Sequence, residues 1–215
     1  QILAAVAPGQ WNITWVRDMA YSTVALARTG HAAEAKRALQ FELGANVGAY
    51  QSYVGSPYQI SVVRYYGDGE EWSDSDSNGP NVEFDGFGLF LWALDAYVGN
   101  SNDTASLATW WPTVKPKVAD VLASLQETSG LVAPDSSIWE THWNGHERTW
   151  AFTNLTAARG LCDAALLAER MNDPTRAMQY RIAGQNLRRA IAAKLTDSHG
   201  ALASNREELL SGDGV

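Results

Sequence analysis

Apolar residues recur at helical spacing in separate stretches of this 215-residue chain, whereas runs that alternate apolar and polar residues are nearly absent. A period near 3.6 predicts amphipathic helices and a period of two predicts strands. The sequence therefore predicts an all-α fold built from antiparallel helix pairs. The expected helices cover about Trp15–Arg28, Ala32–Leu43, Phe87–Tyr97, Thr104–Gln126, Asn154–Met171 and Asp173–Leu195.

Glycine and proline mark several expected helix boundaries. Gly30 follows the first helix, as is common where a helix ends. Asp173 and Pro174 should open the last helix, because Asp accepts a free backbone amide as N-cap and Pro suits the first helical position. Pro112 and Pro116 lie inside the fourth helix, so we predict a break or restart there.

Two long segments, 45–86 and 129–153, separate the helix pairs, and both are rich in Trp, Asp, Glu and Gly. They are too long to be simple connectors, and loops on a rigid scaffold commonly carry function. The tail after about residue 198 is polar and shows no pattern of a closing element. We therefore expect residues 1–215 to form one incomplete domain.

The net charge of −8 and the pI near 4.9 argue against nucleic acid or an anionic membrane as partner. Binding to phosphates relies on clustered Lys and Arg. No run of roughly twenty apolar residues suggests a membrane span. The chain starts at Gln1 without methionine, which fits a processed product, and we expect a secreted or periplasmic protein.

The chain contains nine tryptophans, and several lie outside the strongest helical runs. An indole ring offers a rigid apolar face and one N–H donor, which suits sugars. The alternative is that the rings fill a helical core, which we prefer for Trp92, Trp110 and Trp111. The tryptophans outside the helices or at their starts are Trp11, Trp15, Trp72, Trp139, Trp143 and Trp150.

Glu140 is the first candidate for a catalytic residue. It follows Trp139 in a segment bounded by Gly130 and Gly145. An indole that excludes water from a carboxyl raises its pKa, which would allow the carboxyl to act as a general acid near neutrality. The competing interpretation is a surface charge beside a core aromatic ring.

Three motifs occur in a recognisable order. Trp15-Val-Arg-Asp18 opens the first helix, Glu83-Phe-Asp-Gly-Phe-Gly88 opens the third, and Gly130-Leu-Val-Ala-Pro-Asp-Ser-Ser-Ile-Trp-Glu140 precedes the fifth. Together they resemble the glucoamylase family of glycoside hydrolases, glycoside hydrolase family 15, over most of the chain. The resemblance implies an (α/α)6 barrel with its active site among loops at one end. The helices expected here would form the N-terminal half of that barrel.

The resemblance also implies roles for individual residues. Glu140 would be the general acid, and Arg17 and Asp18 would hydrogen-bond the hydroxyls of a terminal glucose. An arginine fork beside a carboxylate supplies donors and acceptors that can specify hydroxyl positions. The competing interpretation of Arg17 and Asp18 is an ion pair at a helix start. The residues expected to line or support the sugar pocket are Trp15, Trp139, Trp143 and Asp85.

By resemblance, the chain would belong to an inverting, exo-acting hydrolase that releases glucose from the non-reducing ends of α-glucans or α-glucosides. Inversion needs a second carboxylate about 6.5–9.5 Å from the acid. No such motif follows Leu195, and Glu207 and Glu208 lie in the polar tail. The chain alone is therefore expected to be inactive, with the C-terminal half of the enzyme as its partner. Thr141 stands where the family often has a second Glu, so leaving-group preference stays open.

Other interpretations remain open. Asp74, Asp76 and Asn78 match the opening of a calcium loop, although Asn81 replaces the expected apolar residue. No other cofactor is expected. The alternative function is a non-catalytic carbohydrate-binding or regulatory module related to glucoamylases, which would not need Glu140. A polysaccharide lyase would require basic residues around an acidic sugar, and the negative net charge argues against it.

Overall fold

The computed structural model describes residues 1–4 and 11–212. Helices dominate this part of the chain, which confirms the all-α prediction. None of the helices described is both long and apolar enough to cross a lipid bilayer. The helical elements are α1 (Val16–Arg28), α2 (Ala32–Gly44), α3 (Gln51–Val54), α4 (Asp85–Ser101), α5 (Thr104–Val114), the π-helical turn η1 (Lys115–Ala119), α6 (Asp120–Ser124), the 3-10 turn η2 (Ser137–Trp139), α7 (Ala151–Arg170), α8 (Pro174–Lys194) and α9 (Arg206–Ser211).

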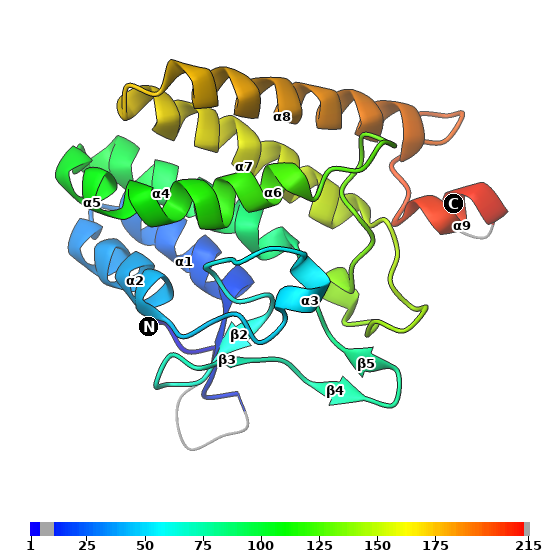
Figure 1. Ribbon diagram of the computed structural model, residues 1–215, viewed down its shortest axis with the longest axis horizontal. Helices are drawn as coiled ribbons and strands as arrows, with labels where there is room; N and C mark the ends of the chain where they lie inside the picture. Colours follow the sequence, from blue (N-terminus) through cyan, green and yellow to red (C-terminus); the bar gives the residue numbers. More distant parts are fainter. Residues whose placement is uncertain (5–10, 213–215) are drawn as a thin grey trace.

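The long helices pack in two layers (Figure 1). In the inner layer α4 lies between α1 and α7, and all three helices begin on the same side of the molecule. In the outer layer α2 packs against α1, and α8 packs against α7. The third outer helix consists of α5, η1 and α6 in succession; its η1 turn packs against α4 and α7, and α6 packs against α7. This alternation of inner and outer helices is half of an (α/α)6 barrel.

Helix α4 is buried along most of its length, as expected for a helix that is apolar on nearly every side. Phe87 and Phe90 are among its buried side chains. Gly88 of α4 faces Gly160 of α7 at the point where the two helices cross. A Cβ atom on Gly88 would lie 2.3 Å from the carbonyl oxygen of Thr156, so this crossing requires glycine.

The predicted break or restart near Pro112 and Pro116 is confirmed in part: α5 ends at Val114 and α6 begins at Asp120, but the chain between them stays helical. Helix α5 continues into α6 through the π-helical turn η1, which contains Pro116. Proline lacks an N–H and its ring clashes with the carbonyl four residues earlier. A wider turn accommodates the ring without ending the helix. The start of α8 is confirmed, since Asp173 is its N-cap and accepts the Arg176 N–H at 3.0 Å.

The tail has more structure than its polar sequence predicts. It contains α9, whose N-cap Asn205 accepts the N–H of Glu208 at 2.9 Å. The carboxylate of Glu207 accepts both the backbone N–H and the hydroxyl of Thr149. These contacts fasten the tail to the segment that leads into α7.

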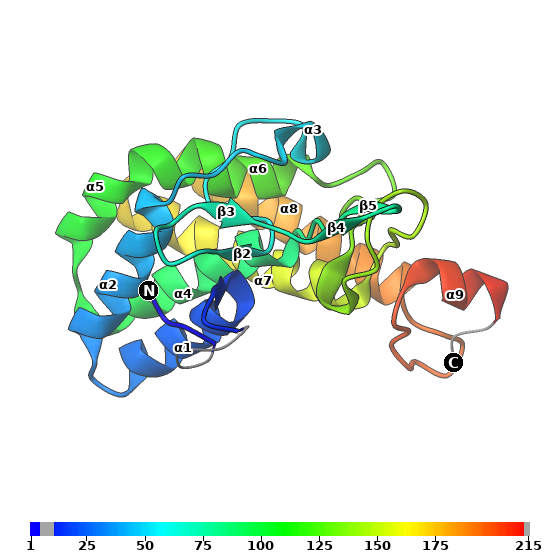
Figure 2. The same cartoon turned by 90° about the horizontal axis from the view of Figure 1, so that it is seen from below.

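Short strands form two small sheets that the sequence did not predict. Each strand has two residues, which is too short for an alternating pattern to be recognised. The strands and α3 lie on the side of the helices where α1, α4 and α7 begin, and Figure 2 shows them in front of the helices. The first sheet contains β1 (Thr14–Trp15), β2 (Arg64–Tyr65) and β3 (Glu71–Trp72), and the second contains β4 (Ser75–Asp76) and β5 (Gly79–Pro80), all antiparallel.

Candidate active site

Two segments meet at the side chain of Arg17, which lies in the first turn of α1. Its Nε donates to Oδ2 of Asp85 at 3.0 Å, and its Nη2 donates to the carboxylate of Glu83. Asp85 opens α4 and Glu83 stands two residues before it, and both side chains are buried. The structure therefore places Arg17 and Asp85 in direct contact.

Burial governs the electrostatics of this cluster. It raises the pKa of Glu83 well above the ordinary value, Arg17 opposes the rise, and the charges of Asp85 and Glu140 add to it. Burial also opposes the charge of Arg17, but Asp85 and Glu83 outweigh it and raise the pKa of the guanidinium. Asn81 Nδ2 donates to Glu83 Oε1 at 2.9 Å. One cation thus faces two acids, and Glu83 is the acid that tends to keep its proton.

A hollow of about 330 Å³ opens beside Arg17. Trp11, Trp15 and Asp18 line it together with Ala4. The centroids of the two indole rings are 5.4 Å apart, and Asp18 is exposed. Aromatic surface next to a few charged groups suits a ligand with apolar faces and polar edges. The structure thus brings three of the predicted site residues, Trp15, Arg17 and Asp18, to one hollow.

Arg64 connects the first sheet to Glu140. Its register partners on the neighbouring strands are Trp15 and Trp72. The guanidinium carbon lies 3.9 Å from the ring centroid of Trp72 and 5.1 Å from that of Trp15. Its Nη1 is 3.9 Å from Oε1 of Glu140, and its Nη2 donates to Asp74. Cation–π contacts and an ion pair therefore hold a positive charge beside Glu140.

The backbone around Glu140 is strained. Glu140 has φ of 50°, and Ser137 and His142 also lie in the left-handed region. Each such residue costs about 1–3 kcal/mol, and strain of this kind gathers at functional sites. Ser136 helps to hold the segment, because its N–H donates to the carbonyl of Val82 at 2.8 Å and its Oγ accepts the Val82 N–H at 3.1 Å.

Trp139 does not shield the carboxyl of Glu140 among the residues that the structure describes. Trp139 is 58% exposed, and the Glu140 side chain is 39% exposed. The indole instead lies near Trp150, with ring centroids 6.2 Å apart. The predicted desolvation of Glu140 by its neighbour is therefore not provided by this part of the chain.

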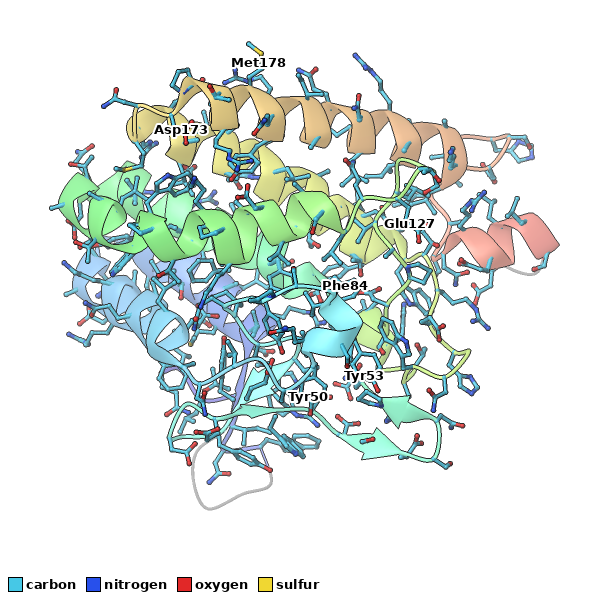
Figure 3. The ribbon with its side chains drawn as sticks, in the orientation of Figure 1. Tyr50, Tyr53, Phe84, Glu127, Asp173 and Met178 are labelled. Atoms are coloured by element: carbon cyan, nitrogen blue, oxygen red, sulfur yellow. The ribbon has the colours of Figure 1, made fainter. Side chains whose placement is uncertain are left out.

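Trp143 contacts other aromatic residues. Its ring packs edge-on against Tyr53 of α3 at 5.2 Å and against Phe84 at 6.0 Å between centroids. Figure 3 labels both partners, Tyr53 on α3 and Phe84, which immediately precedes α4. Trp143 does not line the hollow beside Arg17. Trp143 therefore packs between α3 and the start of α4.

The residues of the calcium hypothesis lie in and beside the β4–β5 hairpin and make other contacts. Asp74 accepts from Arg64, and His142 Nε2 is 3.3 Å from its second carboxylate oxygen. Asp76 accepts the N–H of Asn78 at 2.7 Å. Within the described ranges no group of three or more His, Cys, Asp or Glu residues is placed to hold a metal ion. Asp74 and Asp76 are therefore engaged in contacts within the protein, and calcium binding here stays a prediction.

Three residues of this site were not predicted. Glu83 stands two positions before Asp85 and opens the same motif, which was its only signal in the sequence. Arg64 is a lone charge in an apolar run, which signals a buried partner. Asp135, fully buried five residues before Glu140, had no local signal of its own.

Three solved structures with a similar fold are a glucoamylase, a glycosidase and a rhamnosidase. The chain aligns with a glucoamylase from Saccharomycopsis fibuligera with a TM-score of 0.68 and 15% identity, covering 99% of this chain and 47% of that one. It aligns with a glycosidase described as F290Y with a TM-score of 0.65 and 19% identity, covering 90% and 51%. It also aligns with a rhamnosidase from Klebsiella oxytoca with rhamnose bound. That alignment has a TM-score of 0.62 and 20% identity, and it covers 92% of this chain and 36% of the rhamnosidase.

These likenesses establish the fold, and the chain spans about half the length of these structures or less. No curated protein matches the chain by sequence. The family model for glycosyl hydrolases family 15 matches residues 4–208, nearly the whole chain. The chain therefore belongs to glycosyl hydrolase family 15.

Proposed function

We propose that this chain supplies the acid side of the active site of an inverting, exo-acting glycoside hydrolase. The enzyme would release glucose from the non-reducing ends of α-glucans or α-glucosides. The supporting observation is that Arg17 and Asp18 meet at a hollow next to Asp85, while Arg64 lies between that hollow's Trp15 and Glu140.

Arg17 and Asp18 are proposed to bind sugar hydroxyls in the hollow. Asp85 and Glu83 accept from Nε and Nη2 of Arg17, and among the described residues Nη1 has no hydrogen-bond partner. That donor can point to a ligand without disturbing the ion cluster. The exposed carboxylate of Asp18 supplies acceptors, and the Trp15 ring supplies an apolar surface for the sugar.

Glu140 is proposed to protonate the glycosidic oxygen as its bond to the anomeric carbon breaks. Water then attacks that carbon from the opposite face, with a second carboxylate as base, so the configuration inverts. We propose that the base comes from the remaining half of the same enzyme, since the chain spans only part of the solved glycosidases.

Glu140→Gln in the protein that carries this chain tests the assignment. We expect kcat to fall at least about a thousandfold, because an amide cannot donate the proton. Glu147→Gln is the matched control: Glu147 lies in the same loop and accepts the Gly145 N–H at 2.8 Å, and its replacement should preserve kcat. Unchanged turnover in Glu140→Gln would remove Glu140 from the mechanism.

A non-catalytic carbohydrate-binding or regulatory module is the second candidate function. The exposure of the Glu140 side chain and the cation at 3.9 Å favour it, because a solvated, paired carboxylate is also a suitable binding group. A binder would show no turnover before or after the substitution. Calorimetry with α-glucosides would then show binding by wild type and weaker binding by Glu140→Gln, because the carboxylate that contacts the ligand is lost.

A further inference from the structure

Asp135 joins three parts of the molecule through one buried carboxyl. The side chain is fully buried, and its Oδ2 accepts the Phe84 N–H at 2.8 Å. Oγ1 of Thr153 lies 3.0 Å from Oδ1 and 2.9 Å from Oδ2. Phe84 immediately precedes α4 and Thr153 belongs to the first turn of α7. The carboxyl therefore ties the Glu140 segment to the starts of two inner helices.

The backbone of Asp135 closes the loop that carries Glu140. The Asp135 N–H donates to the carbonyl of Arg148 at 3.0 Å, and the Arg148 N–H donates back at 3.1 Å. Trp150 Nε1 also donates to the carbonyl of Asp135 at 2.8 Å. Both ends of the loop are thus fastened at a single residue.

The same network reaches the strained part of the loop. Oγ1 of Thr153 is 3.1 Å from Oγ of Ser137. Between residues 136 and 142, Ser137 is the first residue with positive φ and Glu140 is the second. Unfavourable backbone conformations persist only when neighbouring contacts hold them. The contacts of Asp135 and Thr153 lie next to the first of these residues.

We propose that Asp135 is a positioning residue whose buried carboxyl holds residues 136–140 in the conformation that presents Glu140 to the site. The catalytic part of this inference rests on the proposed role of Glu140. The hold on the segment follows from the contacts of Asp135 alone.

The protonation of Asp135 defines which substitution should rescue the network. Burial raises the pKa of Asp135 well above its usual range, and the hydrogen bond from the Phe84 N–H opposes the rise. A neutral carboxyl can donate to Thr153 while it accepts from Phe84. An asparagine amide offers the same donor and acceptor, whereas alanine offers neither.

The test compares Asp135→Ala, Asp135→Asn and Thr153→Val with wild type in the protein that carries this chain. Thr156→Val is the matched control, because Thr156 lies one turn further along α7 and donates only to carbonyls of its own helix. Hydrogen–deuterium exchange of residues 136–142 reports the conformation of the segment, and steady-state kinetics report kcat and KM separately.

We expect Asp135→Ala to speed exchange in residues 136–142 and to lower kcat about a hundredfold, with KM within about threefold, as for a misplaced catalytic group. Thr153→Val should also speed exchange in residues 136–142 and lower kcat. Asp135→Asn and Thr156→Val should resemble wild type. If Asp135→Ala fails to fold, Thr153→Val and Asp135→Asn decide the question.

Wild-type exchange and wild-type kcat in Asp135→Ala, or in a folded Thr153→Val when the alanine variant does not fold, would overturn the proposal. An asparagine variant that folds and loses as much kcat as the alanine variant would overturn it too. If Glu140→Gln keeps full turnover, the proposed function fails, but the exchange data still decide whether Asp135 holds the segment.

Discussion

One guanidinium, that of Arg17, connects the start of α1 with the start of α4. The Glu83 and Asp85 side chains that it contacts are at most 4% exposed. Buried carboxyl groups need a partner, because desolvation of an unpaired charge costs several kcal/mol. Arg17 is therefore important for the fold as well as for the proposed sugar site.

Arg17→Ala should lower the free energy of unfolding by about 3 kcal/mol, because it leaves Glu83 and Asp85 buried without their cation. Arg37→Ala is the control: its ion pair with Glu34 is exposed to water, and its loss should lower the free energy of unfolding far less than the loss of Arg17. Urea denaturation measures both values. Equal losses in the two variants would show that the cluster adds no more stability than a surface pair.

Asp163 predicts a pH dependence of stability. Burial raises its pKa from 3.8 to about 6, although Arg159 Nε at 2.6 Å opposes the rise. The folded state therefore holds this proton more tightly than the unfolded state. The resulting stability, about 3 kcal/mol, is complete below about pH 4 and is lost as the pH rises through 6. Asp163→Asn should remove this decline in denaturation curves between pH 4 and 7, and parallel curves for the two proteins would contradict it.

At the level of elements, the helices could be predicted from sequence because their apolar pattern is local. Helix α4 and the N-cap of α8 needed no knowledge of distant residues. The strands and the site contacts could not be predicted, because they depend on partners far along the chain: Arg17 meets Asp85 across 68 positions, and Asp135 meets Phe84 across 51. The π-helical turn at Pro116 could not be predicted either, because it packs against α4 and α7, which are distant in the sequence.

The close crossing of α4 and α7 predicts that a single added methyl group destabilises the fold. Gly88→Ala should lower the free energy of unfolding by about 3 kcal/mol, because the new Cβ would meet backbone atoms of Thr156 and the helices must separate. Gly99→Ala in the same helix is the control. Its Cβ would lie 3.6 Å from the Arg170 side chain, and the higher helix propensity of alanine should preserve stability or raise it by up to about 1 kcal/mol. Thermal denaturation that ranks the two variants the other way would contradict this packing.

At the level of the whole molecule, the proposed site lies where the three inner helices begin (Figures 1 and 2). Asp18 and Asp85 stand in first helical turns, where the helix dipole favours negative charge. The inner helices also line a hollow of about 290 Å³ with Tyr21, Trp92 and Leu155 at its walls. Tyr21 and Leu155 are exposed on this face, by 47% and 45%.

The most direct test of the proposed chemistry compares Glu140→Gln on two substrates, an α-linked glucose disaccharide and α-glucosyl fluoride. Fluoride leaves without needing a proton, whereas a sugar hydroxyl needs the general acid. We predict that kcat/KM of Glu140→Gln falls at least about a thousandfold on the disaccharide and less than about tenfold on the fluoride. Equal losses on both substrates, or no loss on the disaccharide, would contradict the role of Glu140 as the acid.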